Sequence, residues 1–159
     1  MTGTREQHFM DLAIALSAEG MKNGDGGPFG AIVVQGDRVV GRGWNQVLKT
    51  NDPTAHAEVV AIRDACNHLH TYQLHHCEVY TSCEPCPMCL GAIYWARPQR
   101  VYFANTRADA AAIGFDDAFI YGEINRPFAE RSIPLIGLPA AGAWEVFRQW
   151  KEKGTGKLY

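Results

Sequence analysis

The sequence lacks an excess of charge of either sign. Its 159 residues include 15 Lys and Arg against 17 Asp and Glu, which gives a net charge of −2. A protein that binds nucleic acid usually presents a broad basic face, and this balance argues against one. The longest apolar run, residues 88–96, is far below the ~20 residues that cross a bilayer, and residues 1–7 have no apolar core of the signal-peptide type. We therefore expect a cytoplasmic protein with neither a membrane nor a nucleic acid as its partner.

The cysteines show no pattern of disulfide pairing. There are five of them, an odd number, and three crowd into positions 83–89. This usage is typical of a metal site or a catalytic site in a reducing compartment. The length and the hydrophobic fraction of 47% suit one globular core. We expect a single domain over residues 1–159.

The order of the expected elements predicts an α/β protein. Helical periodicity near the N-terminus is followed by a hairpin, a helix, a strand, a helix and a strand, and residues 77–104 make a βαβ unit with parallel strands. This order predicts a three-layer α/β/α sandwich around a mixed five-stranded sheet, with a C-terminal helix on whose inner face Trp144 and Trp150 pack. The five expected strands are residues 30–34, 38–41, 78–82, 100–104 and, as an edge strand broken by prolines, 133–139.

Two segments carry the chemistry. Cys86 and Cys89 are three residues apart at the start of an expected helix, so both sulfurs project to one side. His56 lies at the start of the preceding helix, expected from Thr54 onward, and can add an imidazole nitrogen. Two thiolates, one imidazole and a water make an open catalytic zinc site. Glu58 follows His56 by two residues, about 200° apart on an ideal helix, so both face one pocket only if His56 caps the helix.

Other interpretations of these residues remain open at this stage. Cys83 could be a fourth ligand that closes a structural zinc site, and the CxxC pair could be a redox dithiol. A solvated polar stretch is the favoured interpretation of four further histidines over a second metal cluster. They are His68, His70, His75 and His76.

The pattern H-A-E followed by P-C-x-x-C is the signature of zinc-dependent nucleobase deaminases. In order and separation the two segments resemble the cytidine deaminase-like superfamily. A longer match resembles the small bacterial guanine deaminases: residues 27–30, 51–58, 80–98 (Y-T-S-C-E-P-C-P-M-C-L-G-A-I-Y-W-A-R-P), 112–117 and 119–121. The match fades after about residue 134, although the chain ends in tyrosine as the family pattern does.

The resemblance implies a cytidine deaminase-like fold and a role for each matched residue. His56, Cys86 and Cys89 would bind one zinc ion per chain, and Glu58 would shuttle protons. Substrate contacts would come from Asn45, Phe29, Ala57, Trp95, Asp117 and Tyr159. Trp95 could equally be a core residue, because it lies in a long apolar helix. The family also implies a homodimer, with residues 140–159 a C-terminal helix and tail exchanged between subunits.

The expected reaction is hydrolytic deamination of a free purine base, guanine and water giving xanthine and ammonia. The alternatives are a tRNA adenosine deaminase and a deaminase of another amino-heterocycle, such as cytosine, guanosine or a triazine. A non-enzymatic, zinc-stapled structural module is the remaining interpretation.

Overall fold

A mixed four-stranded sheet organises the first of two units in this chain, whose computed structural model describes residues 4–154. Contacts divide the chain into Met1–Asp117 and Ala118–Tyr159. The strands follow the order β2-β1-β3-β4; β1 pairs antiparallel with β2 and β3, and β3 pairs parallel with β4. The predicted hairpin and the predicted parallel pair are thus confirmed. The strands are β1 (Gly30–Gln35), β2 (Arg38–Trp44), β3 (Cys77–Cys83) and β4 (Arg100–Asn105).

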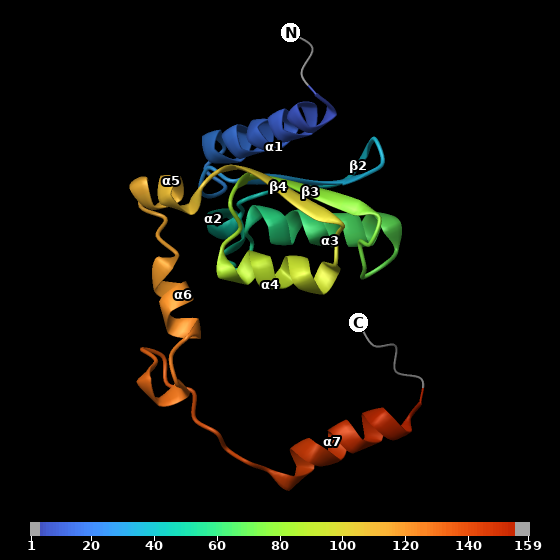
Figure 1. The fold of residues 1–159 in the computed structure, drawn as a ribbon, viewed down its shortest axis with the longest axis vertical. Coiled ribbons are helices and arrows are strands. Elements are labelled where there is room, and N and C mark those ends of the chain that lie inside the picture. Colours follow the sequence, from blue (N-terminus) through green and yellow to red (C-terminus); the bar gives the residue numbers. More distant parts are fainter. Residues whose placement is uncertain (1–3, 155–159) are drawn as a thin grey trace. The chain divides into compact units, whose positions relative to one another are not determined.

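Helices cover both faces of this sheet. Figure 1 shows α1 (Arg5–Lys22) on one side and α3 (Ala57–Leu69) and α4 (Pro87–Ala96) on the other. Two clusters of buried apolar side chains fill the two spaces, as expected for three layers. Glycine allows α3 to lie very close to β2, since a Cβ at Gly43 would lie 2.2 Å from the carbonyl oxygen of Ala57. The sheet therefore fixes the N-terminus of α3.

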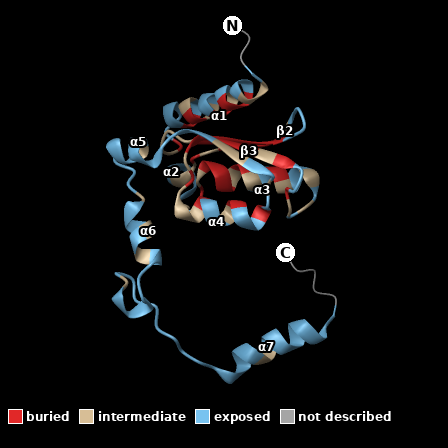
Figure 2. Cartoon of the chain, viewed as in Figure 1, coloured by how far each residue is buried: buried red, intermediate tan, exposed pale blue. Residues whose placement is uncertain are grey.

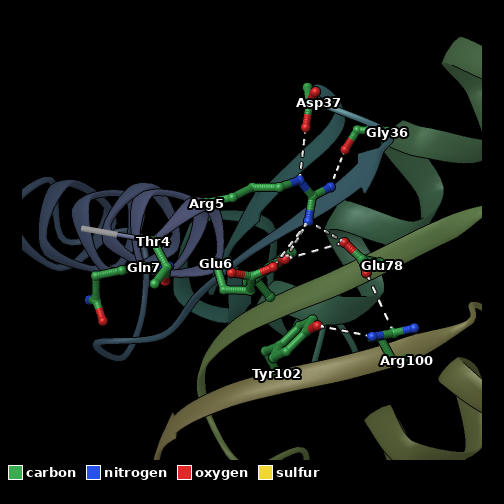
Figure 3. A network of polar contacts seen from close by, with 10 residues as sticks. Thr4, Arg5, Glu6, Gln7, Gly36, Asp37, Glu78, Arg100 and Tyr102 are labelled. Carbon is green, nitrogen blue, oxygen red and sulfur yellow. Dashed lines mark hydrogen bonds and ion pairs between the residues drawn. The ribbon is translucent and has the colours of Figure 1, made fainter. Parts of the chain in front are cut away.

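The N-terminus of α1 is tied to the sheet by polar contacts (Figure 3). Arg5 donates to Asp37 Oδ1 (2.8 Å) and to Glu78 Oε2 (2.7 Å). Glu78 lies on β3 and also faces Arg100 of β4, 3.5 Å from its Nε. Thr4 caps the helix by accepting from the backbone N–H of Gln7, as its place in the sequence predicts. These contacts fix α1 against β3, the strand that leads into the cysteine segment.

The prediction of a fifth strand is wrong for the described residues. Residues 133–139 have no strand conformation and are exposed. Pro134 and Pro139 lack the N–H groups that a strand needs for pairing, and the segment is not among the four strands of the sheet. After β4 the chain forms helices instead: α5 (Arg107–Ala112), α6 (Ala118–Ile124), η1 (Phe128–Glu130) and α7 (Ala141–Glu152).

The second unit buries none of its described residues. Residues 118–154 are exposed in Figure 2, except for a few half-buried ones. Trp144 and Trp150 are 71% and 51% exposed, so the prediction that they pack in the core is wrong for the single chain. The physical reason is that α7 has no second layer within its own unit. A single domain over residues 1–159 remains a prediction, because the contacts divide the chain into two compact units.

None of the described helices combines the length and the hydropathy that crossing a bilayer requires.

Candidate metal centre and active site

Three side chains converge where the helices α3 and α4 begin. The Nδ1 atom of His56 lies 3.5 Å from Cys86 Sγ and 3.6 Å from Cys89 Sγ. One ligand atom from each residue lies within 4.8 Å of the others. Zinc binds thiolate sulfur at ~2.3 Å and imidazole nitrogen at ~2.0–2.1 Å, and Cys₂His is a ligand set of catalytic zinc that leaves a fourth position open. The donor set therefore fits a catalytic zinc ion.

Local backbone structure explains this convergence. His56 is the N-cap of α3 and Cys86 is the N-cap of α4, and both have extended backbone conformations. The side chain of His56 does not cap its own helix, so the imidazole is available to the sulfurs. Cys86 Sγ accepts from the backbone N–H of Cys89 (3.5 Å). Both helix N-termini thus direct partial positive charge at the sulfurs, which favours thiolates.

The electrostatics of the two thiols differ. The hydrogen bond with the Cys89 thiol, followed by that with His56, lowers the pKa of Cys86 to about 4. The same bond, together with burial, raises the pKa of Cys89. The bond with Cys86 raises the pKa of His56. The first thiolate therefore forms at Cys86, the half-exposed member of the pair.

Glu58 lies beside this cluster and is buried. Burial raises the pKa of its carboxyl group, against hydrogen bonds from its own backbone, Cys89 and Thr81. The hydroxyl of Thr81 donates to Glu58 Oε1 at 3.0 Å. Because His56 occupies the cap, with φ −72° and ψ 156°, its direction is not set by helical periodicity. His56 and Glu58 are expected to face one pocket only if His56 caps the helix, and the structure meets this condition.

Asn45 is buried at the end of β2, and its amide is oriented. Its Oδ1 accepts from the backbone N–H of Val47 (3.2 Å), while its backbone N–H donates to the carbonyl of Phe29 (2.9 Å). Gly26 packs against the amide so closely that a Cβ there would lie 2.0 Å from Oδ1. The backbone N–H of Val47 thus occupies one lone pair of the oxygen, which leaves the second lone pair and the NH₂ group able to bind a ligand.

The other expected contacts differ in placement. Phe29 is half-buried and packs edge-on against Phe115, with ring centroids 5.0 Å apart. Trp95 is 64% exposed, so the alternative that it is a core residue is wrong. Asp117 is half-buried, and its pKa is raised by burial and then by the charge of Cys86. Ala57 is fully buried and is the first residue of α3.

Tyr159 lies outside the described residues. Phe115 is a contact that the sequence reasoning did not assign. Its place directly after Gly114, inside the stretch 112–117 that carries the family resemblance, was the sequence feature that could have indicated it. It joins the segment that carries Asp117 to the wall formed by Phe29.

The two other metal hypotheses find no support in the geometry. Cys83 donates through its thiol to the carbonyl of Thr106 (3.5 Å) and does not belong to the ligand cluster. Burial raises its pKa to about 11, which keeps it a neutral thiol. Within residues 4–154, no second cluster forms from the four other histidines. Cys66 packs against the core and Cys77 begins β3.

The fold and the donor set together define a zinc-dependent deaminase of the cytidine deaminase type. Residues 4–105 match the model of the cytidine and deoxycytidylate deaminase zinc-binding region. This chain belongs to that family, and zinc is its cofactor.

Among its relatives, the guanine deaminase of Bacillus subtilis (strain 168) is 51% identical over 151 residues, which are 95% of this chain and 97% of that protein. The solved structure of guanine deaminase from Bacillus subtilis matches with a TM-score of 0.93 at 50% identity, covering 96% of this chain and 98% of that one. The tRNA-specific adenosine deaminase of Agrobacterium fabrum is 42% identical over 144 residues, 90% of this chain and 91% of that protein.

Proposed function

We propose that this protein hydrolyses guanine to xanthine and ammonia, with His56, Cys86 and Cys89 holding one zinc ion and Glu58 moving protons. The observation that carries the reaction type is the buried carboxylate of Glu58 beside three convergent zinc donors. Guanine as the substrate is supported by the 51% identity to a guanine deaminase over almost the whole chain.

Zinc in such a site lowers the pKa of a water molecule towards ~7. Glu58 accepts the proton of the attacking water and delivers it to ring N3 of guanine. The water oxygen adds to C2, and the bond between C2 and the exocyclic nitrogen then breaks. Glu58 takes the remaining proton of the new C2 hydroxyl and transfers it to that nitrogen, so ammonia leaves and xanthine remains. One carboxylate serves both steps because it lies beside the reacting carbon throughout.

Three contacts would orient the base. The Asn45 amide is oriented by the bond from Val47 to its oxygen, and its NH₂ group can donate to an acceptor on the purine. Asp117, when ionised, can only accept, which suits the N–H-rich edge of guanine. The third contact would come from the backbone N–H of Ala57, which has no partner within α3 because it lies in the first turn. Phe29 and Trp95 would wall the ring and exclude water.

We further propose a homodimer in which residues 140–159, including Tyr159, dock on the partner subunit. Large apolar side chains in residues 118–154 are exposed, and exposed apolar patches of this kind mark interfaces. Helix α4 is apolar around its circumference yet exposes Tyr94 and Trp95, which also indicates an interface. Mass measurement in solution tests this proposal; a monomer at micromolar concentration contradicts it.

The second candidate function is deamination of adenosine in tRNA, which the 42% identity to a tRNA-specific enzyme favours. The net charge of −2 argues against it, because phosphate contacts require Lys and Arg near the pocket. A structural zinc module is disfavoured because the ligand cluster has three donors and excludes Cys83.

An ammonia-release assay separates these functions. The purified protein, with its zinc content measured, is given guanine, guanosine, adenine, cytosine and a tRNA anticodon stem-loop. We expect release from guanine, and loss of that release in Glu58→Gln with zinc retained. Release from the stem-loop alone identifies the tRNA enzyme, and no release from any substrate by the zinc-loaded protein identifies a structural module.

A further inference from the structure

A threonine occupies an apolar position of β3. Thr81 is 1% exposed, and its neighbours across the sheet are Ala31 on β1 and Phe103 on β4. Val79, two residues earlier on the same face of the strand, lies in the apolar cluster beneath α3. A hydroxyl at such a position costs free energy unless it is hydrogen-bonded. Its one hydrogen bond among the described residues is the bond to Glu58 Oε1, at 3.0 Å.

From this geometry we propose that Thr81 is a positioning residue for the proton shuttle. An ionised carboxylate can only accept, so the hydroxyl of Thr81 is the donor. The bond holds Oε1 of Glu58 and directs the second oxygen, Oε2, at the reacting water and ring nitrogen. This inference rests on the proposed deaminase function and deepens it by naming the group that orients Glu58.

The positions of Glu58 and Thr81 in the fold explain how this bond can orient the carboxylate. Glu58 is in the first turn of α3, and Thr81 is in the central strand that leads directly to Cys86 and Cys89. A hydrogen bond between them fixes the carboxylate relative to the strand that carries the sulfur donors. Without it, only its own backbone N–H and the Cys89 thiol hold the carboxylate. Rotation about the side-chain torsions of Glu58 then moves Oε2 by an ångström or so, and displacements of about 1 Å at a reacting group cost on the order of 10²-fold in rate.

The test compares three substitutions with one control. Thr81→Val keeps the shape and removes the donor, Thr81→Ala removes the donor and a methyl group, and Thr81→Ser keeps the donor. The control, Val79→Ala, shortens a buried side chain of the same strand that has no polar atom to bond Glu58. Each is measured for zinc per chain, thermal stability, and kcat and KM for guanine.

We expect Thr81→Val and Thr81→Ala to lower kcat by about 10- to 100-fold, the range that loss of an orienting partner typically produces. KM for guanine and the zinc content remain those of the parent, because neither the base contacts nor the ligands change. Thr81→Ser retains parental kcat. Val79→Ala loses stability and keeps kcat. A crystal structure of zinc-loaded Thr81→Val shows the Glu58 carboxylate turned away from its parental position.

Two outcomes overturn the inference. One is a parental kcat in Thr81→Val and Thr81→Ala, and the other is a loss in Thr81→Ser as large as in Thr81→Ala, which would make packing the cause. If Thr81→Val does not fold, the comparison of Ser with Ala decides alone. Failure of the proposed function is distinct, because the parent protein itself would then release no ammonia from guanine.

Discussion

Replacement of Gly26 by alanine should misplace Asn45 without touching the metal donors. A Cβ at Gly26 would lie 2.0 Å from Asn45 Oδ1 and 2.7 Å from its backbone carbonyl oxygen. An ordinary contact begins at 3.4 Å, so the amide has to move by about 1.4 Å. Asn45 is buried, and its oxygen is held by Val47, so the amide cannot yield without breaking that bond.

The expected consequence is a fall of about 100-fold in kcat/KM for guanine, or about 2.7 kcal/mol of transition-state stabilisation. Zinc content should stay at one per chain. Gly91→Ala is the matched control, because a Cβ at this exposed position of α4 meets nothing within 4 Å. Combining Gly26→Ala with Asn45→Ala should cost less than the sum of the two single losses, since both act on the Asn45 amide, although the new Cβ still crowds the Asn45 backbone carbonyl. A kcat/KM for Gly26→Ala within threefold of the parent, at equal zinc content, refutes the role assigned to Asn45.

The remaining predictions concern the metal, the base and the C-terminus. Glu58→Gln should keep zinc and lose about 10²- to 10⁴-fold in kcat, because it cannot transfer protons; near-parental ammonia release contradicts the mechanism. Cys83→Ser should retain one zinc per chain by metal analysis, and in the native parent Cys83 should resist alkylation by iodoacetamide at pH 8, reacting only as the pH approaches its pKa of about 11, where the thiolate forms. Asp117→Ala should lower guanine turnover more than any turnover of other bases, and an equal loss on all of them removes its role in specificity. Deletion of residues 157–159, which include Tyr159, should reduce turnover and spare zinc; unchanged kcat would show that the tail takes no part.

The zinc donors could be predicted from the sequence because they are set by local spacing. Cys86 and Cys89 occupy the N-cap and the first turn of one helix, which places both sulfurs on one side whatever the rest of the chain does. The direction of His56 could not be predicted in this way, since it depends on where α3 begins. Asp52 accepts from both the backbone N–H and the hydroxyl of Thr54, which holds the chain in a turn and delays the helix from Thr54 to Ala57.

Predictions that depended on distant packing were less successful. The apolar spacing of Trp144 and Trp150 correctly predicts a helix and one shared face, but periodicity does not say what covers that face. The segment 133–139 has the composition of an interrupted strand, but Pro134 and Pro139 lack the N–H groups that pairing with a sheet edge requires. Likewise, the apolar sequence around Trp95 suggests burial, whereas the tertiary structure exposes it.

The end of the matched region separates the residues proposed to determine the reaction type from those proposed to determine which base is the substrate. Residues 4–105, which match the zinc-binding region shared across the family, contain the three zinc donors, Glu58 and Thr81. These groups are held by the sheet and by two helix N-termini, so the proposed proton-transfer geometry is built into the matched region. Asp117 and the C-terminal residues lie beyond this region. Substitutions there should change which base is deaminated while leaving zinc binding intact, because the metal donors are positioned by the N-termini of α3 and α4.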